Sequence, residues 1–196
     1  MSNTAIKKAL AMQFIMRSGF FLSLYFMIEY VFTVWSTHHI FLSLVHVPMM
    51  FLTVVLLFLL MRPIRLFFAD EGLSGLRAWT YGVQLMFFAG LLEALFVYIY
   101  NTWLYPDNLF EMHSAVISQY RQAIDMMQQA NAEQTMPSLM QMLKDSQTMI
   151  EETPVPTPIE AAMQALSNDI TYGIFWMIPI SLILRTKPRT SNPQEQ

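Results

Sequence analysis

Four long apolar stretches limit what this chain can fold into. They cover residues 13–35, 40–61, 79–101 and 165–184. A membrane-spanning helix needs about 20 mainly apolar residues, because the hydrocarbon core is about 30 Å thick and each residue rises about 1.5 Å. Only 13% of the residues are charged, whereas a soluble domain carries about 25%. The sequence therefore predicts an all-α, polytopic membrane protein with four transmembrane helices.

The fourth stretch needs polar residues if it is to cross a membrane. Residues 157–160 have the form of a capping box with proline at the first helical position, which predicts a helix from there to the end of the stretch. Its purely apolar part, 170–184, has 15 residues and would be roughly 22 Å long, which is too short to span. We therefore expect Asn168 and Asp169 to enter the membrane with it.

Basic residues are concentrated on one side of the predicted spans. Cytoplasmic segments of membrane proteins carry an excess of lysine and arginine. Here the tail 1–12, the start of the first span, the loop 62–78 and the tail 185–196 hold nine of the eleven basic residues: Lys7, Lys8, Arg17, Arg62, Arg65, Arg77, Arg185, Lys187 and Arg189. Both termini are therefore expected in the cytoplasm, in a bacterial inner membrane.

The beginning of the chain resembles a secretory signal, since Lys7 and Lys8 precede an apolar run. Arg17 interrupts that run, however, and no small-residue cleavage site follows it. This pattern is typical of a retained anchor rather than of a cleaved signal.

The segment 102–164 is acidic and is predicted to lie outside the membrane as a helical hairpin between the third and fourth spans. Pro106 and Asp107 can open one helix and Pro137 a second, and prolines end the second before residue 158. The first of these helices has an apolar stripe at three- and four-residue steps, which predicts an interface with a partner or a second copy. The stripe is formed by Phe110, Ile117, Tyr120, Ile124 and Met127.

Each predicted span also carries one ionisable residue at a similar depth: Glu29, His46, Glu93 and Asp169. Charged groups in lipid are costly, so such residues normally face the bundle interior and find partners. Hydroxyl groups are available, because Thr33 and Thr53 lie at helical spacing from this layer. The layer is either a hydrogen-bonded cluster that holds the helices in register, or a site for a cation or a proton.

Chemistry at other places in the chain is weakly indicated. There are no cysteines, so thiolate metal sites and cysteine nucleophiles are excluded. No metal-binding spacing, phosphate loop, nucleophile elbow or dinucleotide fingerprint occurs, and the identity of any bound metal stays open. A nucleic-acid role is excluded, because no basic face lies outside the membrane-flanking clusters. We expect no catalytic residue and no cofactor.

The stretch Tyr98-Ile99-Tyr100-Asn101-Thr102-Trp103-Leu104-Tyr105-Pro106-Asp107, together with the order of the spans, resembles an uncharacterised membrane family. This is the domain of unknown function 4199 (DUF4199), found mainly in Bacteroidetes. The likeness covers roughly residues 15–184, with 72–82 as weaker support. It implies the same topology and an inner-membrane location, but no activity. An association of its genes with glycosyltransferase genes implies a partner in envelope glycan assembly.

Three functions are compatible with these features, and the third is the least favoured. The first is a non-enzymatic subunit or scaffold of the bacterial envelope, whose outer helices dock a protein partner such as an envelope glycosyltransferase. The second is a small transporter or a cation- or proton-binding membrane protein that uses the intramembrane polar layer. The third is a membrane enzyme acting on a lipid-linked substrate. An apolar stripe that needs a mate favours the first, and a hydrated cavity between the spans would favour the second.

Overall fold

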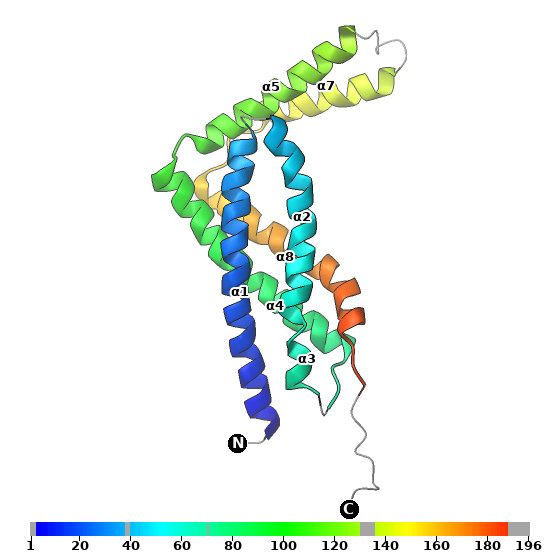
Figure 1. The fold of residues 1–196 in the computed structure, drawn as a ribbon. Coiled ribbons are helices and arrows are strands. Elements are labelled where there is room, and N and C mark those ends of the chain that lie inside the picture. Colours follow the sequence, from blue (N-terminus) through cyan, green and yellow to red (C-terminus); the bar gives the residue numbers. More distant parts are fainter. Residues whose placement is uncertain (1–2, 38–39, 70, 130–135, 188–196) are drawn as a thin grey trace, which may run out of the picture.

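The computed structural model describes residues 3–37, 40–69, 71–129 and 136–187, without the side chains of 3–5, 40–47 and 50. Within these ranges every regular element is helical, as the sequence predicts. The elements are α1 (Asn3–Ser36), α2 (Ile40–Met61), α3 (Ile64–Phe67), α4 (Gly75–Ile99), the π-helix η1 (Tyr100–Leu104), α5 (Asn108–Gln129), α7 (Pro137–Glu152) and α8 (Pro158–Leu184) (Figure 1).

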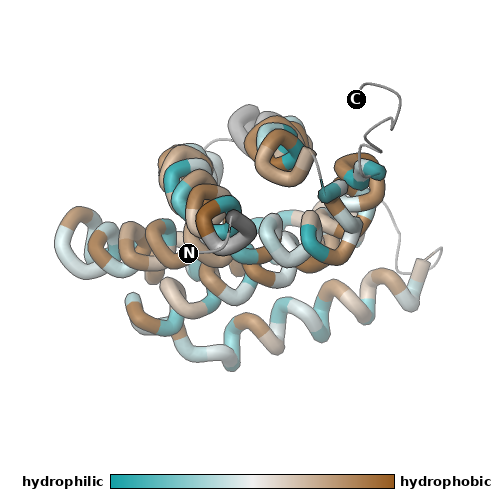
Figure 2. Tube along the Cα trace, turned by 90° about the horizontal axis from the view of Figure 1, so that it is seen from below, coloured by the Kyte–Doolittle hydropathy of each residue, from teal (hydrophilic) through white to brown (hydrophobic). Residues whose placement is uncertain are grey.

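The four long helices α1, α2, α4 and α8 form a bundle (Figure 1). The short α3, the start of α1 and the end of α8 lie at one end of this bundle, which we call the terminal end. Helices α5 and α7 lie side by side across the opposite end. Figure 2 shows hydrophilic and hydrophobic residues alternating along this α5–α7 pair. The molecule thus consists of an apolar bundle with an amphipathic helix pair across one end.

Local sequence explains most helix boundaries. The side chain of Thr157 accepts a hydrogen bond from the backbone of Glu160 and the Glu160 side chain accepts one from the backbone of Thr157, so the predicted capping box is confirmed. These bonds from Thr157 hold the pKa of Glu160 below its usual value. Helix α4 starts earlier than predicted, because Ser74 caps it by accepting from the backbone of Arg77 at 3.3 Å.

Helix α1 is longer than the predicted span and includes most of the predicted N-terminal tail. It has 34 residues, which corresponds to a length of about 51 Å. No proline occurs in it, and residues 5–12 are mainly alanine, lysine, leucine and methionine, all of which favour helix. The helix therefore begins well before the apolar stretch that predicted it.

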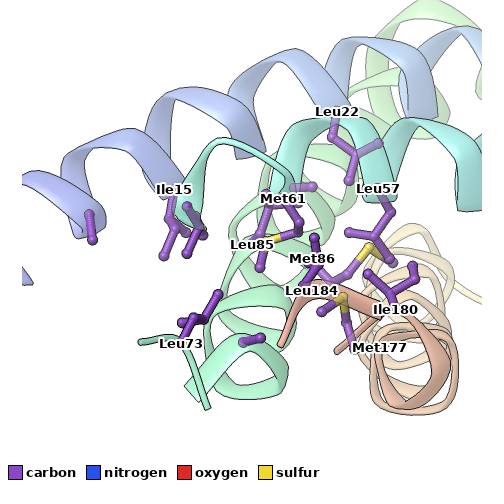
Figure 3. Packing of buried hydrophobic residues seen from close by; sticks show 14 of the residues in the cluster. Ile15, Leu22, Leu57, Met61, Leu73, Leu85, Met86, Met177, Ile180 and Leu184 are labelled. Carbon is purple, nitrogen blue, oxygen red and sulfur yellow. The ribbon is translucent and has the colours of Figure 1, made fainter. Parts of the chain in front are cut away.

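The main hydrophobic core fills the bundle from its middle to the terminal end. It contains Ile15 and Leu22 of α1, Leu57 and Met61 of α2, Leu85 and Met86 of α4, and Met177, Ile180 and Leu184 of α8 (Figure 3). A second, smaller cluster near the α5–α7 pair contains Ala94, Val97 and Ala162. Burial of apolar side chains inside the bundle thus decreases toward the α5–α7 pair.

Polar contacts close the terminal end. The Arg65 guanidinium donates to the carbonyl oxygens of Leu184, at 3.0 Å, and of Ile183. These carbonyls belong to the last turn of α8, which has no helical partners for them. Thr186 and Leu73 exchange two hydrogen bonds of 2.9 and 3.0 Å. The loop after α3 and the end of α8 are therefore joined.

Two helical segments among the described residues are long and apolar enough to cross a membrane. They are Ile6–Ser36 and Gly75–Leu104. The first lies within α1 and the second joins α4 to the π-helix. Among the sequence predictions, the helical class and these two apolar helices are thus shown directly.

Candidate functional site

A cavity of about 680 Å³ lies between α1, α4 and α8, close to the α5–α7 pair. Phe26 of α1 and Met86 of α4 belong to the main core and also line the cavity, so it opens where that core ends. Leu109 and Met112 of α5 and Ile150 of α7 line it as well. The cavity is therefore enclosed by the bundle on one side and by the α5–α7 pair on the other.

Three of the four predicted ionisable residues line this cavity. Glu29 comes from α1, Glu93 from α4 and Asp169 from α8, and each is partly buried. The side chain of the fourth, His46, lies outside the described residues. The structure therefore brings three carboxyl groups from three helices to one space. Polar residues at a similar depth on neighbouring helices can meet in this way.

Glu29 has a hydroxyl partner on the neighbouring helix. Thr53 Oγ1 of α2 donates to Glu29 Oε2 at 3.4 Å. The Tyr25 hydroxyl, one turn before Glu29, donates instead to the backbone oxygen of Met49 at 2.7 Å. Thr33 donates to the backbone oxygen of Glu29 at 2.9 Å. The bonds made by Thr53 and Tyr25 connect α1 to α2 beside the carboxylate.

Glu93 and Asp169 are close neighbours. Their carboxyl groups lie within hydrogen-bonding reach of each other. A carboxylate has no proton to donate, so this contact is a hydrogen bond only when one of the two groups is protonated. Without that proton the buried Asp169 Oδ2 has no donor among the described residues. The pair thus requires either a shared proton or a positively charged group.

Helices α4 and α8 approach closely because each places large side chains over glycines of the other. A Cβ added at Gly90 would lie 2.8 Å from Asp169 Oδ2, and one added at Gly173 would lie 2.7 Å from the Cβ of Met86. Gly82 is covered in the same way by Met177. Small residues that let a neighbouring helix approach closely are typical of helix packing in membranes. Gly90 therefore determines how near Asp169 lies to α4.

This glycine pairing was not predicted, although the sequence contains a signal for it. Gly82, Met86 and Gly90 are spaced by four residues on α4, and Asp169, Gly173 and Met177 are spaced by four on α8. Residues at that spacing share one helix face. Two such faces in antiparallel helices can interlock, but the sequence does not state which helices are neighbours.

The α5–α7 pair is joined by polar contacts near the cavity. His113 Nε2 lies 3.0 Å from the backbone oxygen of Ile150, and both residues line the cavity. Farther along, Arg121 donates to Glu151 Oε1 at 2.8 Å. Hydrogen bonds from Gln147 and Arg121 hold the pKa of Glu151 below its usual value. These contacts keep α7 against α5 at the cavity mouth.

The predicted partner-interface residues lie on α5 in different environments. Ile124 is buried, with 7% of its surface exposed, whereas Phe110 is 66% exposed. Ile117, Tyr120 and Met127 are partly buried. Of this stripe, Phe110 is therefore the large side chain that stays exposed.

A buried polar network lies where α4 passes into the π-helix. Asn101 Nδ2 donates to the Tyr30 hydroxyl and to the backbone oxygen of Val97, both at 2.7 Å. Asn108 Nδ2 donates to Asn101 Oδ1 at 2.7 Å. Both asparagines are 1% exposed. The network connects α1, α4 and α5, and π-helical turns are frequent at functional sites.

The sequence stretch that resembles the DUF4199 family runs through this network. Its Asn101 is the central residue, and Tyr98 and Tyr100 pack their rings against Trp103, Tyr30 and Phe96. The sequence by itself predicts these aromatic residues as anchors at the membrane interface. Their structural role follows from the contact with α1, which lies about 70 residues earlier in the chain.

In the part of the chain that the structure describes, no three histidine or acidic side chains form a group that could hold a metal ion. The cavity wall includes Tyr30, Tyr172 and Trp176 besides its carboxyl groups, and none of the described lysine and arginine residues lines it. Chemically, the arrangement can hold a proton or a positively charged group beside apolar and aromatic surface.

Comparison with known proteins gives one match. The family model described as "Protein of unknown function (DUF4199)" matches residues 14–186. No curated protein matches the chain, and no solved structure matches it.

Proposed function

The chain belongs to the DUF4199 family of proteins of unknown function, and we propose that it is a four-span membrane protein that binds a positively charged ligand between its helices. The observation that carries this proposal is the cavity lined by Glu29, Glu93 and Asp169. Ionisable groups inside a membrane bundle are costly unless they have partners, so they normally have a function. A bound cation would provide such a partner.

Exposed apolar side chains on all four long helices support membrane insertion of each. Phe21 on α1 and Phe51 on α2 are both 65% exposed, Leu95 on α4 is 55% exposed, and Leu182 on α8 is 67% exposed. A protein in water rarely leaves so much apolar surface uncovered, whereas lipid chains cover it without cost. The spans are 13–35, 40–61, 79–101 and 165–184.

The distribution of charge supports the orientation in a bacterial inner membrane. Arg62 precedes α3 and Arg65 lies in it, Arg77 lies in the first turn of α4, and Arg185 follows α8. These residues therefore lie at the terminal end (Figure 1). An excess of basic residues marks the cytoplasmic side. The α5–α7 pair then forms the extracytoplasmic helical hairpin.

The topology can be tested by cysteine labelling, because the chain has no native cysteine. We expect Ser138→Cys, on exposed α7, to react with a membrane-impermeant maleimide in intact spheroplasts, and Glu71→Cys, in the exposed loop before α4, to react only after permeabilisation. Both should label equally in detergent. Labelling of the cysteine at 71 alone in intact cells would reverse the orientation.

Cation binding at Glu93 and Asp169 should release a proton. The two carboxyl groups share a proton when the cavity holds no other positive charge, and an incoming cation makes that proton unnecessary. We expect purified protein in lipid nanodiscs, in weakly buffered solution, to release about one proton per chain when sodium, magnesium or butylammonium chloride is added. A pH indicator measures the release.

Matched variants separate this site from other carboxylates. Asp169→Asn should abolish the release, whereas Asp125→Asn, at an exposed position on α5 away from the cavity, should leave it unchanged. Absence of proton release with all three salts, or equal release by the Asp169→Asn protein, would contradict the proposed function.

A second candidate function is the docking of a protein partner by the α5–α7 pair, such as an envelope glycosyltransferase. It is favoured by large apolar side chains exposed on both helices: Phe110, Met126, Met142 and Met149. Exposed apolar surface on an extramembrane element often marks an interaction site. We rank it second because Ile124, the buried member of the predicted stripe, is covered within the chain itself. Purification from native membranes would identify such a partner.

A further inference from the structure

The size of the cavity indicates an organic ligand rather than a bare ion. Its volume of about 680 Å³ falls within the roughly 300–1,000 Å³ of sites that hold small organic molecules. Inorganic cations instead need a close shell of oxygen ligands, with at least six for calcium and magnesium. Within the described ranges no three acidic or histidine side chains form such a group.

The charged groups around the cavity indicate the sign of the charge on its ligand. Glu29, Glu93 and Asp169 line it together with His113, and among the described residues no lysine or arginine does. Thr53 donates to Glu29, but the buried Asp169 Oδ2 has no donor among the described residues beyond the neighbouring carboxyl group. An anionic ligand would be repelled here, and a neutral apolar one would gain no charge contact from these carboxyl groups.

The rest of the wall suits an apolar body with a delocalised or alkylated positive charge. Phe26, Tyr30, Tyr172 and Trp176 line the cavity together with Val97 and Leu109. Aromatic faces attract organic cations, most strongly when the cation is poorly hydrated. Tyr172 and Trp176 are 48% and 39% exposed, so both leave ring surface accessible at the cavity wall.

We propose that the cavity binds a lipophilic organic cation, with the positive centre beside Glu93 and Asp169 and the apolar groups against Tyr172 and Trp176. This rests on the proposed function and names its ligand class. Quaternary ammonium, phosphonium and alkylamine compounds belong to this class.

Tetraphenylphosphonium and tetraphenylborate provide a direct test, because they have nearly the same shape and opposite charge. Binding of each to the full-length protein in nanodiscs would be measured by equilibrium dialysis, with empty nanodiscs subtracted. We expect saturable binding of tetraphenylphosphonium, at about one per chain, and none of tetraphenylborate. Glu93→Gln and Asp169→Asn should each weaken phosphonium binding at least about tenfold, since each removes a charge contact.

The aromatic contribution has a matched control in the chain. Trp176→Leu should weaken phosphonium binding about threefold or more, while Trp103→Leu, 70% exposed and not in the cavity wall, should not change it. Proton release with sodium or magnesium but no phosphonium binding would overturn the ligand class and leave the proposed function standing. Equal binding of both tetraphenyl ions would overturn the ligand class as well. Absence of both cation-linked proton release and phosphonium binding would overturn both proposals.

Discussion

Replacing Asn101 with leucine should lower the free energy of unfolding by about 2–4 kcal/mol. Asn101 is 1% exposed and makes three hydrogen bonds, with Tyr30, Val97 and Asn108. Leucine has a similar size but no polar side-chain atoms, so the side-chain amide of Asn108 would lose its 2.7 Å bond and keep the 3.3 Å bond to the Tyr30 hydroxyl. Each buried polar group left without a partner costs about 1–3 kcal/mol.

The neighbouring Thr102 provides the control. Its hydroxyl oxygen is buried without a hydrogen-bond partner among the described residues. Thr102→Val keeps the shape and removes that group, so the unfolding free energy should stay the same or rise. Both variants can be compared by denaturant or thermal unfolding in one detergent. If Asn101→Leu is as stable as Thr102→Val, the network does not hold α1, α4 and α5 together.

Replacing Gly173 with alanine should push α4 and α8 apart. The new Cβ would lie 2.7 Å from both Cβ and Cγ of Met86, and Cβ can move only if the helix moves. Overpacking of this kind costs about 1–3 kcal/mol, which exceeds the gain of about 1 kcal/mol from replacing glycine by alanine in a helix. We therefore expect a lower unfolding temperature, and weaker cation-linked proton release because Asp169 lies one turn away.

Gly75→Ala should behave in the opposite way. A Cβ at Gly75 has Ser181 O at 3.9 Å as its nearest neighbour, which is an ordinary contact. The variant should be as stable as the native protein or slightly more stable. Destabilisation of the same size at Gly75 and Gly173 would mean that the loss at Gly173 does not come from contact with Met86.

The candidate site was partly predictable. Glu29, Glu93 and Asp169 stand out because carboxyl groups are rare within apolar stretches, and counting residues from the helix ends gives their depth. The depth of a residue, however, does not show in which direction around the helix axis its side chain points. That Glu93 lies beside Asp169, and that Thr53 rather than Tyr25 bonds to Glu29, depends on which helices are neighbours.

The role of the stripe on α5 could not be read from its pattern. Apolar residues at helical spacing predict that one face is covered, but not what covers it. In the structure part of the covering comes from α7, because the pair is joined by His113–Ile150 and Arg121–Glu151 contacts. Phe110 is not covered by this contact between α5 and α7 and is exposed.

Sequence alone determined the helices of this protein, since capping residues, prolines and long apolar stretches act over a few neighbouring positions. It determined the α8 start at Pro158, the bounds of α2 and the all-helical class. The tertiary structure decided the pairing of α4 with α8, the Asn101 network and the cavity. Each of these depends on contacts between residues about 70 or more positions apart, and local periodicity carries no information about such distances.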